Sequence, residues 1–121
     1  MEMLIAGANC LEQEYLNELT RDPEHRVVMV DTGEEALQQV RLEAYDLIFL
    51  DLSLSDISGA DLITKIKEEL PEVMVIVTTE SNSKELEIQV RKKGILFYLI
   101  KPIVPHYLRS IIDHLTTVGA K

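Results

Sequence analysis

The sequence predicts an α/β domain in which five strands and five helices alternate, a (βα)5 doubly wound five-stranded parallel sheet. Short apolar runs of four to six residues, rich in Val, Ile and Leu, recur five times along the 121 residues. Amphipathic stretches that open with helix-capping residues lie between these runs. The runs are continuously apolar instead of alternating, which is typical of parallel strands covered by helices on both faces.

The predicted strands are the five apolar runs, and none of them approaches the roughly 20 residues that a membrane-spanning helix needs. They are Met3–Ala6, Val27–Val30, Leu47–Leu50, Val73–Val77 and Ile95–Ile100. Right-handed crossovers between such strands produce an open sheet with helices on both faces. In these sheets the functional crevice lies at the carboxyl ends of the strands, so we expect the functional residues directly after each run.

The first two helices are predicted from paired capping residues. Asn9 is expected to cap the first, with Glu12 three residues later as in a capping box, and Thr32 and Glu35 repeat this pattern before the second. The first apolar stripe consists of Leu11, Tyr15, Leu16 and Leu19. The second consists of Ala36, Leu37 and Val40.

The third helix is expected to begin after Ser58 and to stop before Pro71, because the residue preceding a proline disfavours helical backbone. Its apolar residues are Leu62, Ile63, Ile66 and Leu70. Asn82 with Glu85 opens the fourth helix, and Gly94 is placed to end it as the C′ residue.

The fourth and fifth helices carry different kinds of signal. In the fourth, Leu86, Ile88 and Val90 alternate with a period of two, which by itself favours a strand. Pro105 suits the first turn of the fifth helix, because its missing N–H has no partner to lose there. The fifth stripe consists of Leu108, Ile111, Ile112 and Leu115.

Composition and length exclude several classes of protein. The net charge is −9, from 12 Lys and Arg against 21 Asp and Glu, which argues against a protein that binds the nucleic-acid backbone. Cys10 is the one cysteine, so an intramolecular disulfide is excluded, and the three histidines lack the spacing of a helical zinc site. The N-terminus lacks the features of a signal peptide. We expect one soluble cytoplasmic domain over residues 1–121, with no nucleic-acid or membrane partner.

Polar residues with complementary chemistry follow the last three strands. Asp51 ends the third run, Thr78, Thr79 and Glu80 follow the fourth, and Lys101 follows the fifth. A carboxylate, a hydroxyl donor and an ammonium group therefore meet at one edge of the sheet. This set suits a phosphorylated carboxylate, because the added group brings negative charge and strong hydrogen-bond acceptors.

Taken together, these motifs resemble the response regulator receiver domain, the module that accepts a phosphoryl group from a histidine kinase onto an aspartate. The resemblance covers essentially the whole chain and implies the flavodoxin-like receiver fold. The residues that carry it are Asp46–Leu52, Gly59, the Thr that ends the fourth strand, Gly94–Tyr98 and Lys101-Pro102.

The resemblance implies a role for each matched residue. Asp51 matches the phosphoacceptor, Lys101 the lysine that contacts the phosphoryl oxygens, and Tyr98 the aromatic switch residue. Thr79 is assigned as the switch threonine because it lies 28 residues after Asp51 and 22 before Lys101, and Thr78 stays the alternative. The expected pocket-lining residues are Asn9, Ser53 and Glu80.

The first strand departs from the family. Receiver domains normally end it with acidic residues that hold Mg²⁺ together with the phosphoacceptor, whereas this chain has Gly7-Ala8-Asn9-Cys10. Asp51 is at most the one retained carboxylate ligand. Mg²⁺ prefers carboxylate oxygens, so we expect its affinity to fall sharply.

These residues are compatible with three functions to different degrees. The first is a phosphoacceptor domain of a two-component phosphorelay, served by a histidine kinase or phosphotransfer protein and acting on an output domain or partner protein, with no enzymatic turnover. A homodimer through the fourth helix, fifth strand and fifth helix is a further expectation. The alternative is a phosphorylation-independent interaction or dimerisation module. A flavin or small-molecule binder is disfavoured, because the loop Gly7-Ala8-Asn9 is too short to cradle a phosphate.

Overall fold

The computed structural model describes residues 1–81 and 83–119 and contains one five-stranded sheet. The strands are β1 (Glu2–Ala6), β2 (Arg26–Val30), β3 (Leu47–Asp51), β4 (Met74–Thr79) and β5 (Phe97–Ile100). The helices are α1 (Gln13–Arg21), α2 (Gly33–Leu42), α3 (Gly59–Glu69), α4 (Lys84–Arg91) and α5 (Pro105–Gly119). None of the described helices is both long and apolar enough to cross a membrane.

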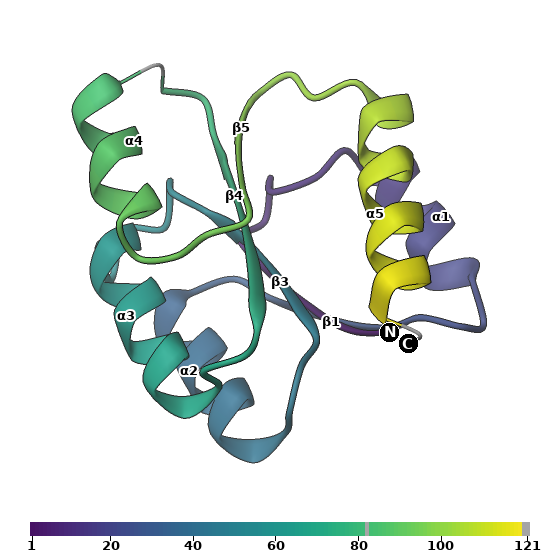
Figure 1. Cartoon of the computed structure of the whole chain (residues 1–121), viewed down its shortest axis with the longest axis horizontal. Coiled ribbons are helices and arrows are strands. Elements are labelled where there is room, and N and C mark those ends of the chain that lie inside the picture. Colours follow the sequence, from purple (N-terminus) through teal and green to yellow (C-terminus); the bar gives the residue numbers. More distant parts are fainter. Residues whose placement is uncertain (82, 120–121) are drawn as a thin grey trace.

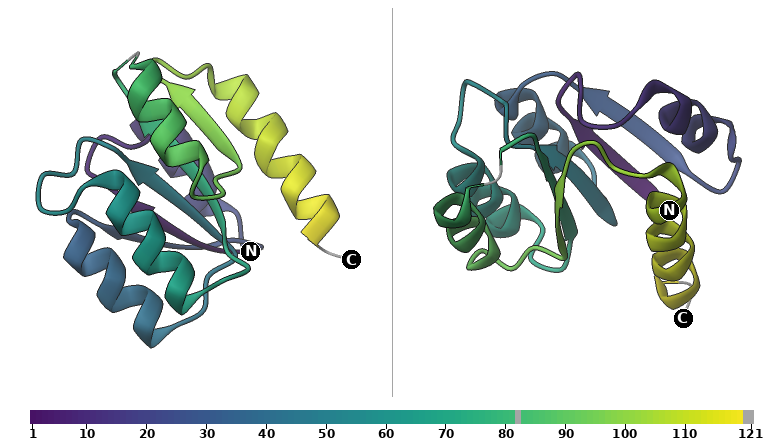
Figure 2. Two further views of the ribbon diagram at one scale, coloured as in Figure 1. Left: turned by 60° about the vertical axis from the view of Figure 1, so that its left-hand side comes forward. Right: turned by 90° about the horizontal axis from the view of Figure 1, so that it is seen from above.

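The sheet is parallel throughout and has the strand order β2-β1-β3-β4-β5, which confirms the predicted doubly wound architecture. The order reverses direction at β1, so the crevice beside β1 and β3 is the topological switch point. Figures 1 and 2 show α1 and α5 on one face of the sheet and α2, α3 and α4 on the other.

Two apolar cores fill the spaces between the sheet and its helices. One packs the inner faces of α1 and α5 against Phe49 of β3 and Ile76 of β4. The other packs α2, α3 and α4 against Leu50 of β3 and Val77 of β4. Because successive strand residues point to opposite faces, Asp51 and its register partner Thr78 belong to the α1/α5 face.

Two of the predicted helix caps are confirmed in detail. The Thr32 hydroxyl accepts a hydrogen bond from the Glu35 amide at 3.1 Å, and the Ser58 hydroxyl accepts one from the Asp61 amide at 3.2 Å. Helix α3 has Leu70 as its C-cap, directly before Pro71. These local signals were sufficient because each cap satisfies an amide that the helix itself leaves without a partner.

The first predicted cap is wrong. Helix α1 begins only at Gln13, its N-cap is Glu12, and no side chain caps it. Residues 7–12 form a loop instead, in which the Cys10 amide donates to the Gly7 carbonyl at 3.3 Å. Cys10 and Leu11 belong to this loop, and both side chains are buried. Leu11, the first apolar residue of the predicted stripe, is therefore part of the core although it is not helical.

The fourth helix is confirmed as a helix, with a different start. The predicted cap Asn82 lies outside the described residues, and the Ser83 hydroxyl accepts from the Leu86 amide at 3.2 Å. Gly94 has φ +84°, as a helix-ending glycine requires, although it lies two residues beyond the C-cap Lys92 instead of one. Strand β5 begins at Phe97, two residues later than predicted.

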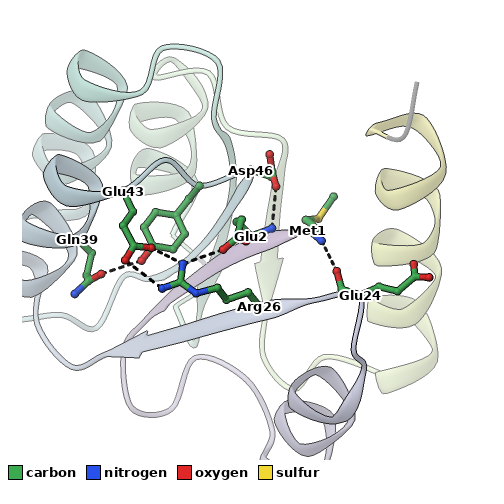
Figure 3. Close-up of polar contacts among 8 residues, drawn as sticks. Met1, Glu2, Glu24, Arg26, Gln39, Glu43 and Asp46 are labelled. Carbon is green, nitrogen blue, oxygen red and sulfur yellow. Dashed lines mark hydrogen bonds and ion pairs between the residues drawn. The ribbon is translucent and has the colours of Figure 1, made fainter.

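The amino ends of the strands are held by a separate set of polar contacts, shown in Figure 3. Arg26 of β2 forms ion pairs with Glu2 of β1 and with Glu43, which follows α2. Asp46 accepts a hydrogen bond from the Glu2 amide at 2.8 Å, just before β3 begins. These contacts lie at the end of the sheet opposite Asp51, so the carboxyl edge is left for the functional site.

Candidate functional site

Asp51 is the last residue of β3 and its side chain is buried at the carboxyl edge of the sheet. Only 1% of its surface is exposed. Its Oδ1 atom accepts a hydrogen bond from the Ser53 amide at 2.8 Å. A carboxylate buried to this degree needs a charged partner, and the structure provides one from β5.

Lys101 follows β5 and is that partner. Its ammonium group forms an ion pair with Asp51 Oδ2 and also donates to the Asn9 carbonyl at 2.6 Å. The ammonium group thus joins the loop after β1 to the carboxyl ends of β3 and β5. The structure therefore brings Asp51 and Lys101 together, as predicted from the strand ends, and it adds the backbone of Asn9 to the pair.

The hydroxyl that reaches Asp51 belongs to Thr78. Its Oγ1 atom donates to Asp51 Oδ2 at 3.2 Å and lies 3.3 Å from the Cys10 Sγ atom. Thr79 is also buried, but it lies on the α2/α3/α4 face and its hydroxyl accepts a hydrogen bond from the Ser81 amide at 3.0 Å. Cys10 is not among the predicted site residues, and Thr78 is predicted only as the alternative to Thr79. The signal that identifies the Thr78 contact is the register of Asp51 with Thr78.

The electrostatic setting keeps Asp51 ionised and Cys10 protonated. Burial acts to raise the pKa of Asp51, but the Lys101 ammonium and the Ser53 amide outweigh it and hold that pKa below its ordinary value. Burial raises the pKa of Cys10 to about 12, although its hydrogen bond to Thr78 acts in the opposite direction. The site therefore holds a carboxylate that only accepts hydrogen bonds, beside a neutral thiol.

The residues present do not fit the metal site of receiver domains. Gly7 stands where β1 ends, with φ +121°, and a Cβ atom built on it would lie 2.7 Å from the Cβ of Asp51. An acidic side chain there would collide with Asp51. Among residues 1–81 and 83–119, no three His, Cys, Asp or Glu side chains group closely enough to hold a metal ion. Oδ2 of Asp51 is moreover already engaged by Lys101 and Thr78.

An open cleft of about 670 Å³ lies beside the ion pair, between the loop after β1 and the start of α5. Asn9, Glu80 and Lys101 line it, so two of the three predicted pocket-lining residues lie along it. Ser53 does not line this cleft, and it contacts Asp51 through its amide. Glu80 is exposed and places a negative charge at the rim.

Tyr98 lies on β5 opposite Val77, on the same face of the sheet as Thr79. Its ring is half-buried against the α2/α3/α4 core, and the Arg91 guanidinium of α4 stands 5.9 Å from the ring centroid. Its hydroxyl is buried without a hydrogen-bond partner among the described residues. Thr79 and Tyr98 are thus separated by the sheet from the side chains that contact Asp51.

Comparisons with known proteins agree with this geometry. The family model of the response regulator receiver domain matches residues 4–113. The chain is 29% identical over 113 residues to the transcriptional regulatory protein ZraR of Escherichia coli K12, a match that includes 93% of this chain and 26% of ZraR. It is 29% identical over 116 residues to the regulatory protein LuxO of Vibrio cholerae, covering 96% of this chain and 25% of LuxO. The chain therefore spans about a quarter of the length of these relatives.

Solved structures give the same result. The signal receiver domain of a LuxO repressor protein from Vibrio parahaemolyticus is 29% identical and superposes with a TM-score of 0.82, covering 98% of this chain and 92% of that one. The DrrB receiver domain activated with BeF3 is 25% identical, with a TM-score of 0.78 over 96% of this chain and 97% of that one. With the family model matching most of its length, this chain belongs to the response regulator receiver domain family.

Proposed function

We propose that this receiver domain accepts a phosphoryl group on Asp51 from a histidine kinase or a phosphotransfer protein. The observation that carries the proposal is the pairing of the buried Asp51 carboxylate with the Lys101 ammonium group at the carboxyl edge of the sheet. The phosphoacceptor role is general for the family, and the comparisons lend no support to the phosphorylation-independent alternative.

The chemistry follows from the charges. An oxygen of the Asp51 carboxylate attacks the phosphorus atom, and the bond from phosphorus to the donor's nitrogen or oxygen breaks with its electron pair leaving on the donor. The product is an acyl phosphate: the former carboxylate is now an uncharged ester, and the negative charge at the site is the charge that the phosphoryl oxygens bring with them. Lys101 is a flexible point charge, so its ammonium group follows the charge to those oxygens.

Lys101 is well placed for that movement. Its side chain is 16% exposed, lines the open cleft, and is held by Asp51 and by the Asn9 carbonyl. In the resting domain the ion pair covers Asp51, so the ammonium group must move aside before a phosphoryl group can reach the carboxylate. No divalent cation enters this proposal, because the donor set around Asp51 does not fit one.

The switch is proposed to run through the other face of the sheet. Phosphorylation would draw Thr79 from the Ser81 amide toward the phosphoryl group, and Tyr98 would repack into the space that Thr79 leaves. Four apolar side chains on α4, on β5, directly before α5 and on α5 are exposed. They are Ile88, Ile100, Val104 and Tyr107. An output domain or a second copy would meet the change there.

The proposal is tested by incubating the protein with acetyl phosphate and measuring its intact mass. Wild-type protein is expected to gain one phosphoryl group, and Asp51→Asn is expected to gain none. Asp31→Asn is the matched control, because Asp31 is an exposed acid that follows β2 at the same edge of the sheet. If the wild type gains no mass under conditions that modify another receiver domain, the proposal fails.

A further inference from the structure

Three buried side chains from separate segments, one of them the acceptor Asp51, are linked in a row by hydrogen bonds. Cys10 comes from the loop after β1, Thr78 from β4 and Asp51 from β3. The Cys10 Sγ atom lies 3.3 Å from Thr78 Oγ1, and Thr78 Oγ1 lies 3.2 Å from Asp51 Oδ2. All three are at most 1% exposed, so water does not compete for these contacts.

The order of protons along this chain is fixed by chemistry. An ionised carboxylate accepts hydrogen bonds and donates none, so the single hydroxyl proton of Thr78 must point to Asp51. The lone pairs of the hydroxyl oxygen then face Cys10, whose thiol remains protonated because burial raises its pKa to about 12. The chain therefore runs from the Cys10 thiol through the Thr78 hydroxyl to Oδ2.

The two oxygens of Asp51 are consequently unequal. Oδ2 accepts from two residues, through the Lys101 ammonium group and the Thr78 hydroxyl, whereas among the described residues Oδ1 accepts from Ser53, whose amide donates at 2.8 Å. Oδ1 thus has the less occupied lone pairs. Lys101 lines the open cleft and has a flexible side chain, but Thr78 is fully buried in a central strand and stays on Oδ2 when Lys101 moves.

We propose that Thr78 is a positioning residue for phosphoryl transfer: its hydroxyl, held in turn by Cys10, pins Oδ2 so that Oδ1 is the oxygen presented to the phosphoryl donor. This proposal rests on the proposed function of Asp51 as the acceptor. It assigns Thr78 a part separate from that of Thr79, whose hydroxyl lies on the other face of the sheet.

The competing explanation is that Thr78 only fills space in the strand. The two explanations differ in which of two variants, Thr78→Val or Thr78→Ser, stays closer to the wild type. Thr78→Val keeps the shape and removes the hydroxyl, whereas Thr78→Ser keeps the hydroxyl and removes a methyl group. If Thr78 positions the carboxylate, Thr78→Ser keeps the wild-type properties. If Thr78 only packs in the core, Thr78→Val keeps them.

The first measurement is the pKa of Asp51. It is obtained from the pH dependence of the carboxyl ¹³C NMR signal, with no phosphoryl donor present. Thr78→Val is expected to raise this pKa by about one pH unit, because a hydrogen bond to a charged group is lost. Thr78→Ser is expected to stay close to the wild type, and Cys10→Ala to shift in the same direction as Thr78→Val by less. A wild-type pKa in Thr78→Val would overturn the proposal.

The second measurement is the pH profile of phosphorylation by acetyl phosphate. In Thr78→Val the acidic midpoint of this profile is expected to move to higher pH by the same amount as the pKa of Asp51. In Thr78→Ser the midpoint is expected to match the wild-type value. If the wild type is not phosphorylated at all, the proposed function fails, while the NMR titration still decides whether Thr78 holds the carboxylate.

A measurement on the wild type covers the case in which Thr78→Val does not fold. The Thr78 hydroxyl proton is expected to be protected from exchange with water at neutral pH and to appear in the proton spectrum. It should be lost or shifted in Asp51→Asn, because an amide oxygen accepts more weakly than a carboxylate. A rapidly exchanging hydroxyl proton in the wild type would contradict the positioning role.

Discussion

The backbone of Gly7 lies directly against the side chain of Asp51: a Cβ atom on Gly7 would lie 2.7 Å from the Cβ of Asp51. Gly7 also has φ +121°, which L side chains rarely adopt. The end of β1 therefore closes directly over the acceptor, in the place from which receiver domains present acidic residues. Gly7 thus lets the end of β1 approach Asp51 closely, and it contributes no carboxylate to the site.

Gly7→Ala is expected to destabilise the domain more than Gly94→Ala. Both glycines have positive φ, so each substitution costs about 1–3 kcal/mol of backbone strain. A Cβ atom at Gly94 meets nothing within 4 Å, whereas at Gly7 it overlaps Asp51 and adds about 1–3 kcal/mol. Urea unfolding of the two variants measures the difference. Equal losses would show that the apposition of Gly7 and Asp51 is not tight.

Lys101→Met is expected to lower the free energy of unfolding by about 3–5 kcal/mol near neutral pH, because it leaves a buried carboxylate without its partner. Asp51→Asn in the same chain should recover most of the loss, because no charge then remains buried. Lys101→Arg is the control that keeps the charge.

The pH dependence of this effect has a definite sign. The pKa of Asp51 is held below its ordinary value in the folded domain, so its contribution is present above the ordinary pKa and is lost as pH falls through the folded pKa. The gap between wild type and Lys101→Met should therefore narrow in acid. A gap that is constant with pH would count against the ion pair as its cause.

Mg²⁺ removal is expected to leave phosphorylation unchanged. With Asp51 as the one carboxylate at the site, acetyl phosphate should give the same adduct in EDTA as with Mg²⁺. Added Mn²⁺ should not selectively broaden NMR signals around Asp51. Ala8→Asp is the positive control, because Ala8 lines the cleft beside Lys101 and a carboxylate there avoids the collision at Gly7. Saturable broadening around Asp51 in the wild type would contradict this prediction.

Asp56 is expected to stabilise helix α2 from outside that helix. Its two carboxylate oxygens accept hydrogen bonds from the Gly33 and Glu34 amides, each at 2.9 Å, and these contacts lower its pKa. Asp56→Ala should therefore destabilise the domain near neutral pH, and the difference should disappear as the carboxylate protonates below about pH 4. Asp31→Ala is the control. Thermal unfolding across pH checks the prediction, and a loss for Asp56→Ala that persists in acid would contradict it.

The fold was predictable because its signals are local or simply periodic. Each buried strand is a continuous apolar run, and the Thr32 and Ser58 hydroxyls cap helices within three residues of themselves. The start of α1 was not predictable in this way. The loop from Gly7 to Glu12 is shaped by contacts distant in sequence, among them the Lys101 ammonium group on the Asn9 carbonyl.

The site was predictable in part for the same reason. Asp51 and Lys101 end their strands, so the parallel sheet alone brings them to one edge. Which threonine reaches Asp51 depends on strand register and on the face to which each side chain points. Sequence intervals led to Thr79, whereas the register places Thr78 beside Asp51. The role of Thr79 as the switch residue stays a prediction.

The most direct measurement is to locate the phosphoryl group itself. Protein treated with acetyl phosphate is reduced with borohydride, which converts an aspartyl phosphate to homoserine, and the digested peptides are sequenced by mass spectrometry. Phosphorylation of the buried Asp51 predicts homoserine at position 51 and at no other acidic residue. Aspartate recovered unchanged at position 51, or homoserine elsewhere in the chain, would contradict the assignment of Asp51 as the acceptor.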